Sequence, residues 1–146
     1  MRLGINGRLD TIQAAILLAK FEIFPEEIEK RQIVAERYNR ALKEKFYFQE
    51  VPKDCKSAWA QYSIRPGNQN KKTREDYIKV LKDNGTPTAI YYLKPLHLQK
   101  LFSHLGYNKD DLLLSGKIAK DIFSISFHPY LKEDDQDIII NLLVNC

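Results

Sequence analysis

Residues 4–15 read GINGRLDTIQAA, and the second half of this stretch predicts where the first helix begins. Asp10 and Gln13 have the spacing of a capping box, in which the carboxylate accepts an N–H of the first turn and the glutamine reaches back. Apolar residues then recur at helical spacing, at Ile12, Ile16, Ala19 and Ile23. We therefore expect a helix over residues 10–23.

A second helix is predicted directly after the first. Pro25 suits the first turn of a helix, where its missing N–H is not needed, and the acids Glu26 and Glu27 favour the positive end of the helix dipole. Its buried stripe is expected at Ile28, Ala35, Tyr38 and Leu42. Residues 1–45 should thus form an angled pair of helices, over about 10–23 and 25–44.

The remainder of the chain alternates predicted strands and helices. Strands are expected at residues 58–64, 88–92 and 122–126, and helices near 71–83, 98–104, 114–121 and 134–144. No repeat, low-complexity segment or linker interrupts this pattern, so residues 1–146 should be a single domain, with sheet and helices in 46–146. The expected fold class is α/β (α+β), a small sandwich with helices packed on a short mixed or antiparallel sheet.

Composition narrows the class of protein. Of the 146 residues, 44% are hydrophobic and 29% charged, which is typical of soluble globular proteins. The longest apolar run is far too short to span a membrane. Cys55 and Cys146 do not have the spacing of zinc ligands, so we expect no bound metal, and their small number favours a cytoplasmic location. The net charge of +4 would be compatible with binding to nucleic acid. However, acidic residues are interspersed with the basic ones, and only residues 71–74 form a basic cluster. We expect no nucleic-acid partner.

Five blocks in the sequence carry a resemblance to a known family. They are residues 4–15, 57–64 (SAWAQYSI), 85–92 (GTPTAIYY), 94–99 (KPLHLQ) and 128–131 (HPYL). In this order and spacing they resemble the DegT-type family of pyridoxal-phosphate-dependent nucleotide-sugar aminotransferases. The resemblance implies the C-terminal domain of a fold-type-I aminotransferase, a homodimer with its active site at the subunit interface, and a role in making amino sugars for surface polysaccharides.

The resemblance also implies roles for residues in the first block. Asn6 matches an asparagine that reaches across the dimer to the cofactor phosphate, and its amide is a suitable donor. Without the resemblance, an asparagine between two glycines is a turn residue. Arg8 matches an arginine near the sugar, where a guanidinium can bind a carboxylate in a bidentate manner. The alternative for Arg8 is a solvent-exposed side chain beside a helix start.

Three further residues are implied as contacts of the nucleotide sugar. Tyr91 and Tyr92 match a pair of residues placed against the substrate, where a phenol can both stack and donate a hydrogen bond. His97 lies in the adjoining block. Taken without the family, the tyrosines are packing residues of a strand and His97 caps a loop.

The cofactor of the family is pyridoxal phosphate, which is carried on a lysine in a segment that precedes the first block. No lysine of this sequence matches that segment, so we expect no residue here to be catalytic, no covalently bound cofactor and no transaminase activity from this chain alone. In the intact enzyme, glutamate would supply the amino group that is transferred to a keto-sugar nucleotide. The alternatives are a non-enzymatic dimerisation or interaction module, one half of a split enzyme, or a small basic nucleic-acid-binding domain.

Overall fold

A computed structural model of the chain describes residue 7 and residues 9–146. The first element, helix α1, spans Thr11–Leu42. The Asp10 carboxylate accepts a hydrogen bond from the backbone N–H of Gln13 at 2.8 Å. The helix therefore begins at the Asp10 cap that the sequence predicted, but the Gln13 side chain forms no hydrogen bond back to Asp10 in the described part of the chain, so the reciprocal half of the capping box is absent there.

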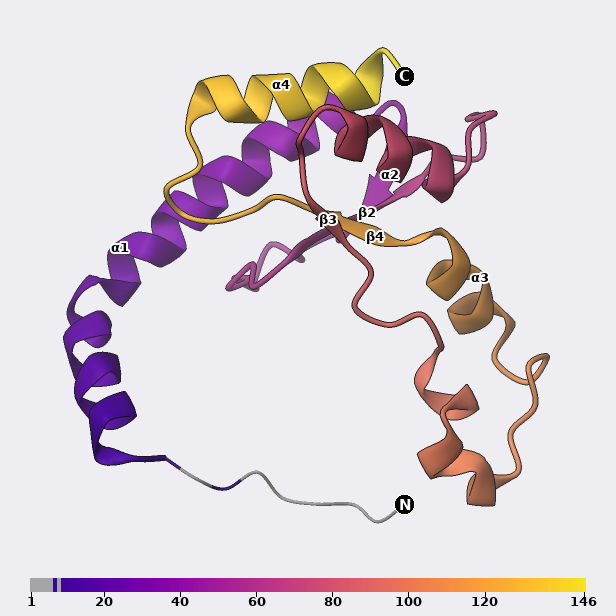
Figure 1. Cartoon of the computed structure of the whole chain (residues 1–146), viewed down its shortest axis with the longest axis horizontal. Helices are drawn as coiled ribbons and strands as arrows, with labels where there is room; N and C mark the ends of the chain where they lie inside the picture. The colour runs from indigo at the N-terminus through magenta and orange to yellow at the C-terminus, as the bar shows by residue number, and fades with distance from the viewer. Residues whose placement is uncertain (1–6, 8) are drawn as a thin grey trace.

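The expected pair of helices is instead one helix that continues through Pro25. Pro25 has no N–H for the carbonyl of Phe21, and its ring crowds that carbonyl, so a helix that passes through a proline bends. Figure 1 shows such a bend between the indigo N-terminal part of α1 and the rest of the helix. The proline thus changes the direction of the helix without ending it.

The sheet has four short strands, all antiparallel, in the order β1-β2-β4-β3. They are β1 (Phe46–Phe48), β2 (Tyr62–Pro66), β3 (Thr88–Ala89) and β4 (Phe123–Ile125). Tyr62 pairs with Ile125, and Ser63 pairs with Ser124. The sandwich expected from the sequence is confirmed, and its sheet is antiparallel rather than mixed.

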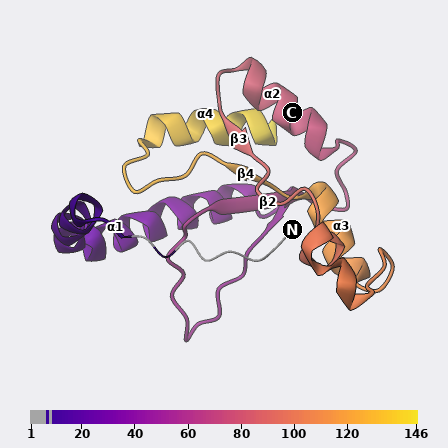
Figure 2. The ribbon, with the colours of Figure 1, turned by 60° about the horizontal axis from the view of Figure 1, so that its bottom comes forward.

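One face of the sheet carries the hydrophobic core. The C-terminal half of α1 places the Tyr38 ring 4.9 Å from the Tyr62 ring of β2. Helix α2 (Arg74–Asp83) places the Tyr77 ring 4.9 Å from that of Phe46 in β1. Helix α4 (Glu133–Val144) buries residues beside both helices, and Figure 2 shows α2 and α4 on the same side of the sheet.

The opposite face is only partly covered. Because side chains alternate along a strand, Ser63 and Ser124 lie on this face, where their hydroxyl oxygens are 2.7 Å apart. Helix α3 (Leu113–Asp121) contacts β2 and borders this face with Ile118. Two short 3₁₀ helices, η1 (Leu96–Leu98) and η2 (Lys100–Leu105), lie in the arm between β3 and α3 (Figure 1).

The strand bounds differ from those predicted. The strand expected at residues 58–64 begins only at Tyr62, because Trp59 has a backbone φ of +46°, which breaks the extended conformation. The strand expected at 88–92 ends at Ala89, so Tyr91 and Tyr92 lie in a loop. Strand β1 was not predicted, since three aromatic residues in a row show no alternation.

Candidate functional site

Tyr91 lines a pocket at the end of the sheet. The pocket has a volume of about 210 Å³ and lies between the residues that precede β2, strand β3 and strand β4. Its lining consists of Ala60, Gln61, Pro87, Thr88, Ala89, Tyr91, Ser124, Ile125, Ser126 and Phe127. None of these residues is charged, so the pocket suits an uncharged polar group rather than a phosphate.

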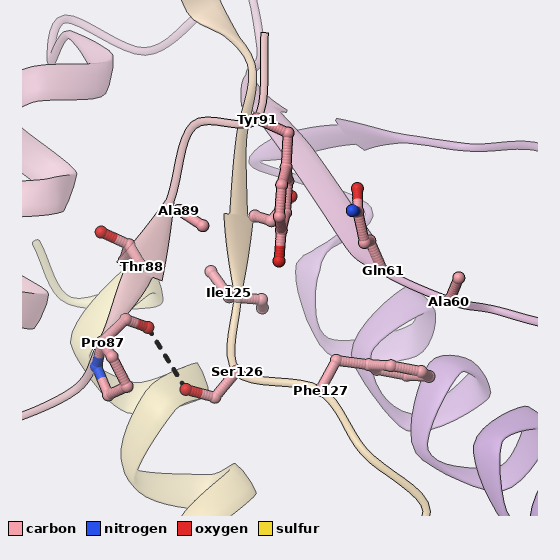
Figure 3. A pocket seen from close by; sticks show the side chains of 10 residues that line it. Ala60, Gln61, Pro87, Thr88, Ala89, Tyr91, Ile125, Ser126 and Phe127 are labelled. Carbon is pink, nitrogen blue, oxygen red and sulfur yellow. Dashed lines mark hydrogen bonds between the residues drawn. The ribbon is translucent and has the colours of Figure 1, made fainter. Parts of the chain in front are cut away.

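Figure 3 shows how these side chains are arranged. The Tyr91 ring points into the pocket between Gln61 and Ile125, and the Phe127 ring lies at its lower edge. The Ser126 hydroxyl donates to the carbonyl of Pro87 at 3.2 Å, which joins the residue after β4 to the residue before β3. Tyr91 is 54% exposed. Its phenol is therefore free to stack or to donate to a ligand.

Tyr92 and His97 are not brought into this pocket. Tyr92 is 70% exposed and does not line it. His97 is only 8% exposed and lies in η1, with its ring edge-on to Tyr107 at 6.3 Å between centroids. Its Nε2 atom has no hydrogen-bond partner among the described residues. A buried polar atom without a partner costs about 1–3 kcal/mol.

Asn6 and Arg8 both lie outside the described residues. The neighbouring described residues establish only that the chain enters α1 through the Asp10 cap. The roles implied for these two side chains therefore stay predictions.

Two buried tyrosines belong to the core rather than to a site. The Tyr38 hydroxyl donates to the carbonyl of Ser126 at 3.1 Å, and the Tyr62 hydroxyl donates to the Asn39 side chain at 2.7 Å. Burial raises the pKa of both phenols well above the ordinary value, and for Tyr62 the neighbouring Tyr38 adds to the increase. Neither tyrosine can act as an acid near neutral pH.

The described lysines do not fit the attachment of pyridoxal phosphate. An attachment lysine needs a desolvated pocket that favours its neutral amine. Every described lysine is exposed or half-buried, and the two half-buried ones are engaged: Lys30 pairs with Glu26 at 2.7 Å, and Lys45 donates to the carbonyl of Val144. Covalent attachment of the cofactor to the described part of this chain is thus not supported.

No cluster of three or more His, Cys, Asp or Glu side chains within residue 7 and residues 9–146 could hold a metal ion. Over the same residues, no helix combines the length and apolar character that crossing a membrane requires.

Gln61 is the pocket residue that sequence reasoning missed as a functional candidate. In the sequence, Gln61 is one position of a predicted strand. In the structure, its side chain is exposed and lines the pocket together with Tyr91. The signal for it is tertiary, because Gln61 and Tyr91 are 30 positions apart and lie next to β2 and after β3, two strands that β4 separates in the sheet.

Comparison with known proteins places this geometry in a family context. The model of the DegT/DnrJ/EryC1/StrS aminotransferase family matches residues 1–144. The UDP-2-acetamido-2-deoxy-3-oxo-D-glucuronate aminotransferase of Pseudomonas aeruginosa is 41% identical over 148 residues, which cover 99% of this chain and 38% of that protein. The pleiotropic regulatory protein of Geobacillus stearothermophilus is 37% identical over 94% of this chain and 37% of its own length.

Solved structures agree with the sequence relatives. The crystal structure of a DegT DnrJ EryC1 StrS aminotransferase from Brucella abortus superposes with a TM-score of 0.84 at 45% identity, over 99% of this chain and 38% of that one. DesV from S. venezuelae has the same TM-score at 20% identity, over 97% of this chain and 38% of its own, which shows the shared fold alone. The chain therefore spans a little over a third of the length of these relatives.

Proposed function

Because the chain belongs to the DegT/DnrJ/EryC1/StrS aminotransferase family, we propose that it forms the C-terminal part of a pyridoxal-phosphate-dependent aminotransferase that acts on a keto-sugar nucleotide. The observation that supports this most is the match over residues 1–144 together with 41% identity to a nucleotide-sugar aminotransferase. The chain spans 38% of that relative, so the remaining residues needed for the reaction would lie outside it. The product would be an amino sugar for a surface polysaccharide.

In this proposal the chain binds and orients the cofactor and the sugar nucleotide. The lysine that would carry the cofactor is not among its described residues. When bound, pyridoxal phosphate supplies the electron sink for moving an amino group from glutamate to the keto sugar. Asn6 would donate to the cofactor phosphate, and Arg8 would bind an anionic group of the sugar. Tyr91 would contact the uncharged part of the nucleotide sugar in its pocket, and Tyr92 and His97, which lie outside that pocket, would contact other parts of the substrate.

A second candidate function is an interaction module that pairs with itself or with a separately encoded part. Apolar side chains are exposed all around the N-terminal half of α1, at Ile12, Ile16, Leu17, Leu18, Phe21, Ile23 and Phe24. A helix that is apolar on every side is normally buried within a larger structure. The proposed homodimer, with an active site between subunits, would also cover such a helix.

Complementation tests the enzyme proposal. The chain is expressed together with the lysine-bearing N-terminal part of a close relative, and glutamate-dependent transamination of a keto-sugar nucleotide is measured. Activity is the expected result. If the pair stays inactive while the relative's own C-terminal part restores activity, the chain is an interaction module or a degenerate remnant, and the site roles lapse.

Variants in the active pair separate the two roles in the first block. Asn6→Ala should weaken retention of the cofactor by about 1.5–3 kcal/mol, because one hydrogen bond to a charged group is lost. Arg8→Ala should raise the KM for the sugar nucleotide with a smaller effect on the cofactor. Asn68→Ala and Arg40→Ala remove the same side-chain types from exposed positions and serve as matched controls. Equal effects of the variants and their controls would refute both assignments.

A further inference from the structure

The partly covered face of the sheet carries a cavity at the end that borders α3. Its volume is about 350 Å³, which is within the range of roughly 300–1,000 Å³ typical of small-molecule sites. Residues 47–49 and 63–65 line it from the sheet and from the position after β1. Ile118 and Ile122 line it from α3 and from the residue directly after that helix, so one wall is apolar.

Arg65 supplies the charge of this cavity. Among the described residues that line the cavity, Arg65 alone is charged. It is half-buried and forms no ion pair with a described residue. Its guanidinium carbon lies 4.3 Å from the centre of the Tyr47 ring, a cation–π contact that orients the charge without neutralising it. A half-buried cation without a counter-ion favours the binding of an anion.

A hydroxyl group lies on the same side of the sheet as Arg65. Ser63 and Arg65 are two positions apart in β2, so their side chains point to the same face. The Ser63 hydroxyl oxygen is 2.7 Å from that of Ser124, and either can be the donor. Because a hydroxyl has one donor and two acceptor sites, Ser63 can accept from Ser124 and donate to a ligand. The polar part of the cavity therefore offers one cation and one hydroxyl donor.

We propose that this cavity binds a small monocarboxylate with an apolar body. The planar guanidinium presents its N–H groups in a fork that matches the two oxygens of a carboxylate. A phosphate group carries about −1.5 to −2 at neutral pH, which a single arginine does not neutralise. Ile118, Ile122 and the Tyr47 ring would contact the apolar body of the ligand. A carboxylate without such a body, such as acetate, lacks this contact.

The inference goes beyond the proposed function and does not rest on it. Gln61 of the Tyr91 pocket precedes the first residue of β2, whereas Arg65 is the fourth residue of that strand. The linings of the two cavities have no residue in common among those that the structure describes. Binding at the two cavities can therefore be measured separately.

Ligand-observed NMR of the full chain with three probes tests the proposal. Benzoate should bind with a Kd of about 1 mM, which the small size of such a ligand allows. Benzamide has nearly the same shape but no charge, and it should bind about tenfold more weakly, as should acetate, which has no apolar body. Equal binding of benzoate and benzamide, or no binding of benzoate, would overturn the proposal.

Variants locate the site of the carboxylate. Arg65→Gln should weaken benzoate about tenfold, because hydrogen bonds from a charged donor are lost. Arg65→Lys keeps the charge but not the fork, and should weaken benzoate about threefold. Arg40→Gln removes the same charge from an exposed position of α1, and should change the affinity less than about twofold. Ile118→Ala should weaken benzoate and benzamide alike, because it removes apolar contact only.

Equal losses in Arg65→Gln and Arg40→Gln would show attraction to net charge alone and would overturn the site. Circular dichroism confirms the fold of each variant, and the comparison of benzoate with benzamide on the unsubstituted chain tests the proposal without any variant. No transamination is measured in this assay, so its failure leaves the proposed function to be decided by complementation.

Discussion

Gln32→Leu is predicted to destabilise the chain by breaking a contact between α1 and the segment that precedes β2. The indole N–H of Trp59 donates to the Gln32 side-chain oxygen at 2.8 Å, and Trp59 is only 3% exposed. A second contact from α1 supports the same residue, because the Arg31 guanidinium donates to the Trp59 carbonyl at 2.9 Å. These bonds hold Trp59 in its left-handed conformation, which costs on the order of 1–3 kcal/mol for a residue other than glycine.

The size of the loss in stability follows from the Trp59 indole N–H, which is left without a hydrogen-bond partner. Leucine preserves most of the glutamine volume but cannot accept a hydrogen bond, so the buried indole N–H loses its partner. A buried donor without a partner costs about 1–3 kcal/mol, and a half-buried leucine recovers part of this through apolar contact. We expect a loss of about 1–2 kcal/mol, which corresponds to a decrease in Tm of about 2–8 °C for a chain of this length.

Equilibrium unfolding in urea measures this loss. Trp59 is the only tryptophan, so its fluorescence reports the environment of this contact. The midpoint should fall at an unchanged slope. Gln13→Leu is the matched control, because Gln13 is also on α1 but exposed, and its side chain has no hydrogen bond to a described residue.

A double-mutant cycle with Trp59→Phe, followed by circular dichroism, isolates the pair. A coupling energy near zero, or a Gln32→Leu effect no larger than that of Gln13→Leu, would refute the reasoning.

Three further predictions concern association, lysine chemistry and pH. The exposed apolar residues at 12–24 of α1 should drive self-association of the purified chain at tens of micromolar, and a monodisperse monomer without dye-binding surface in sedimentation would contradict this. Incubation with pyridoxal phosphate and borohydride should give no stoichiometric adduct at any one lysine, because every described lysine is exposed or half-buried; mass spectrometry that finds a single modified position would contradict this. The N–H and hydroxyl of Thr73 donate to Asp76 and hold the pKa of this carboxyl below its ordinary value, so its contribution to stability is present at neutral pH and lost as pH falls below about 4. Asp76→Asn should flatten that part of the pH dependence in acid unfolding, whereas Asp54→Asn, at an exposed position, should not.

Local chemistry explains what could be predicted about the helices. The Asp10 cap begins α1, and the Thr73 and Asp76 side chains form the capping box of α2. Both act within three residues. The Asp10 cap was predicted from the sequence, whereas the Thr73 cap was not, and the helix expected near 71–83 begins only at Arg74. Pro25 shows the limit of such reasoning: proline is compatible with a helix start and with a bend, and its neighbours along the chain do not decide between them. The strand expected at residues 58–64 begins only at Tyr62 for a related reason. The left-handed conformation of Trp59 is stabilised by contacts with α1 rather than by adjacent residues.

The sequence by itself determined the family, the Asp10 helix cap, the antiparallel or mixed sandwich and the candidate residues, because motifs and periodicity are local properties of the chain. It did not determine which of those residues share a site. Tyr91 lies with Gln61 in one pocket while His97 is buried elsewhere, and Arg65 shares a cavity with Ile118. Such neighbours are set by the order β1-β2-β4-β3 and by the contact of α3 with β2, which depend on distant segments and therefore exist only in the folded chain.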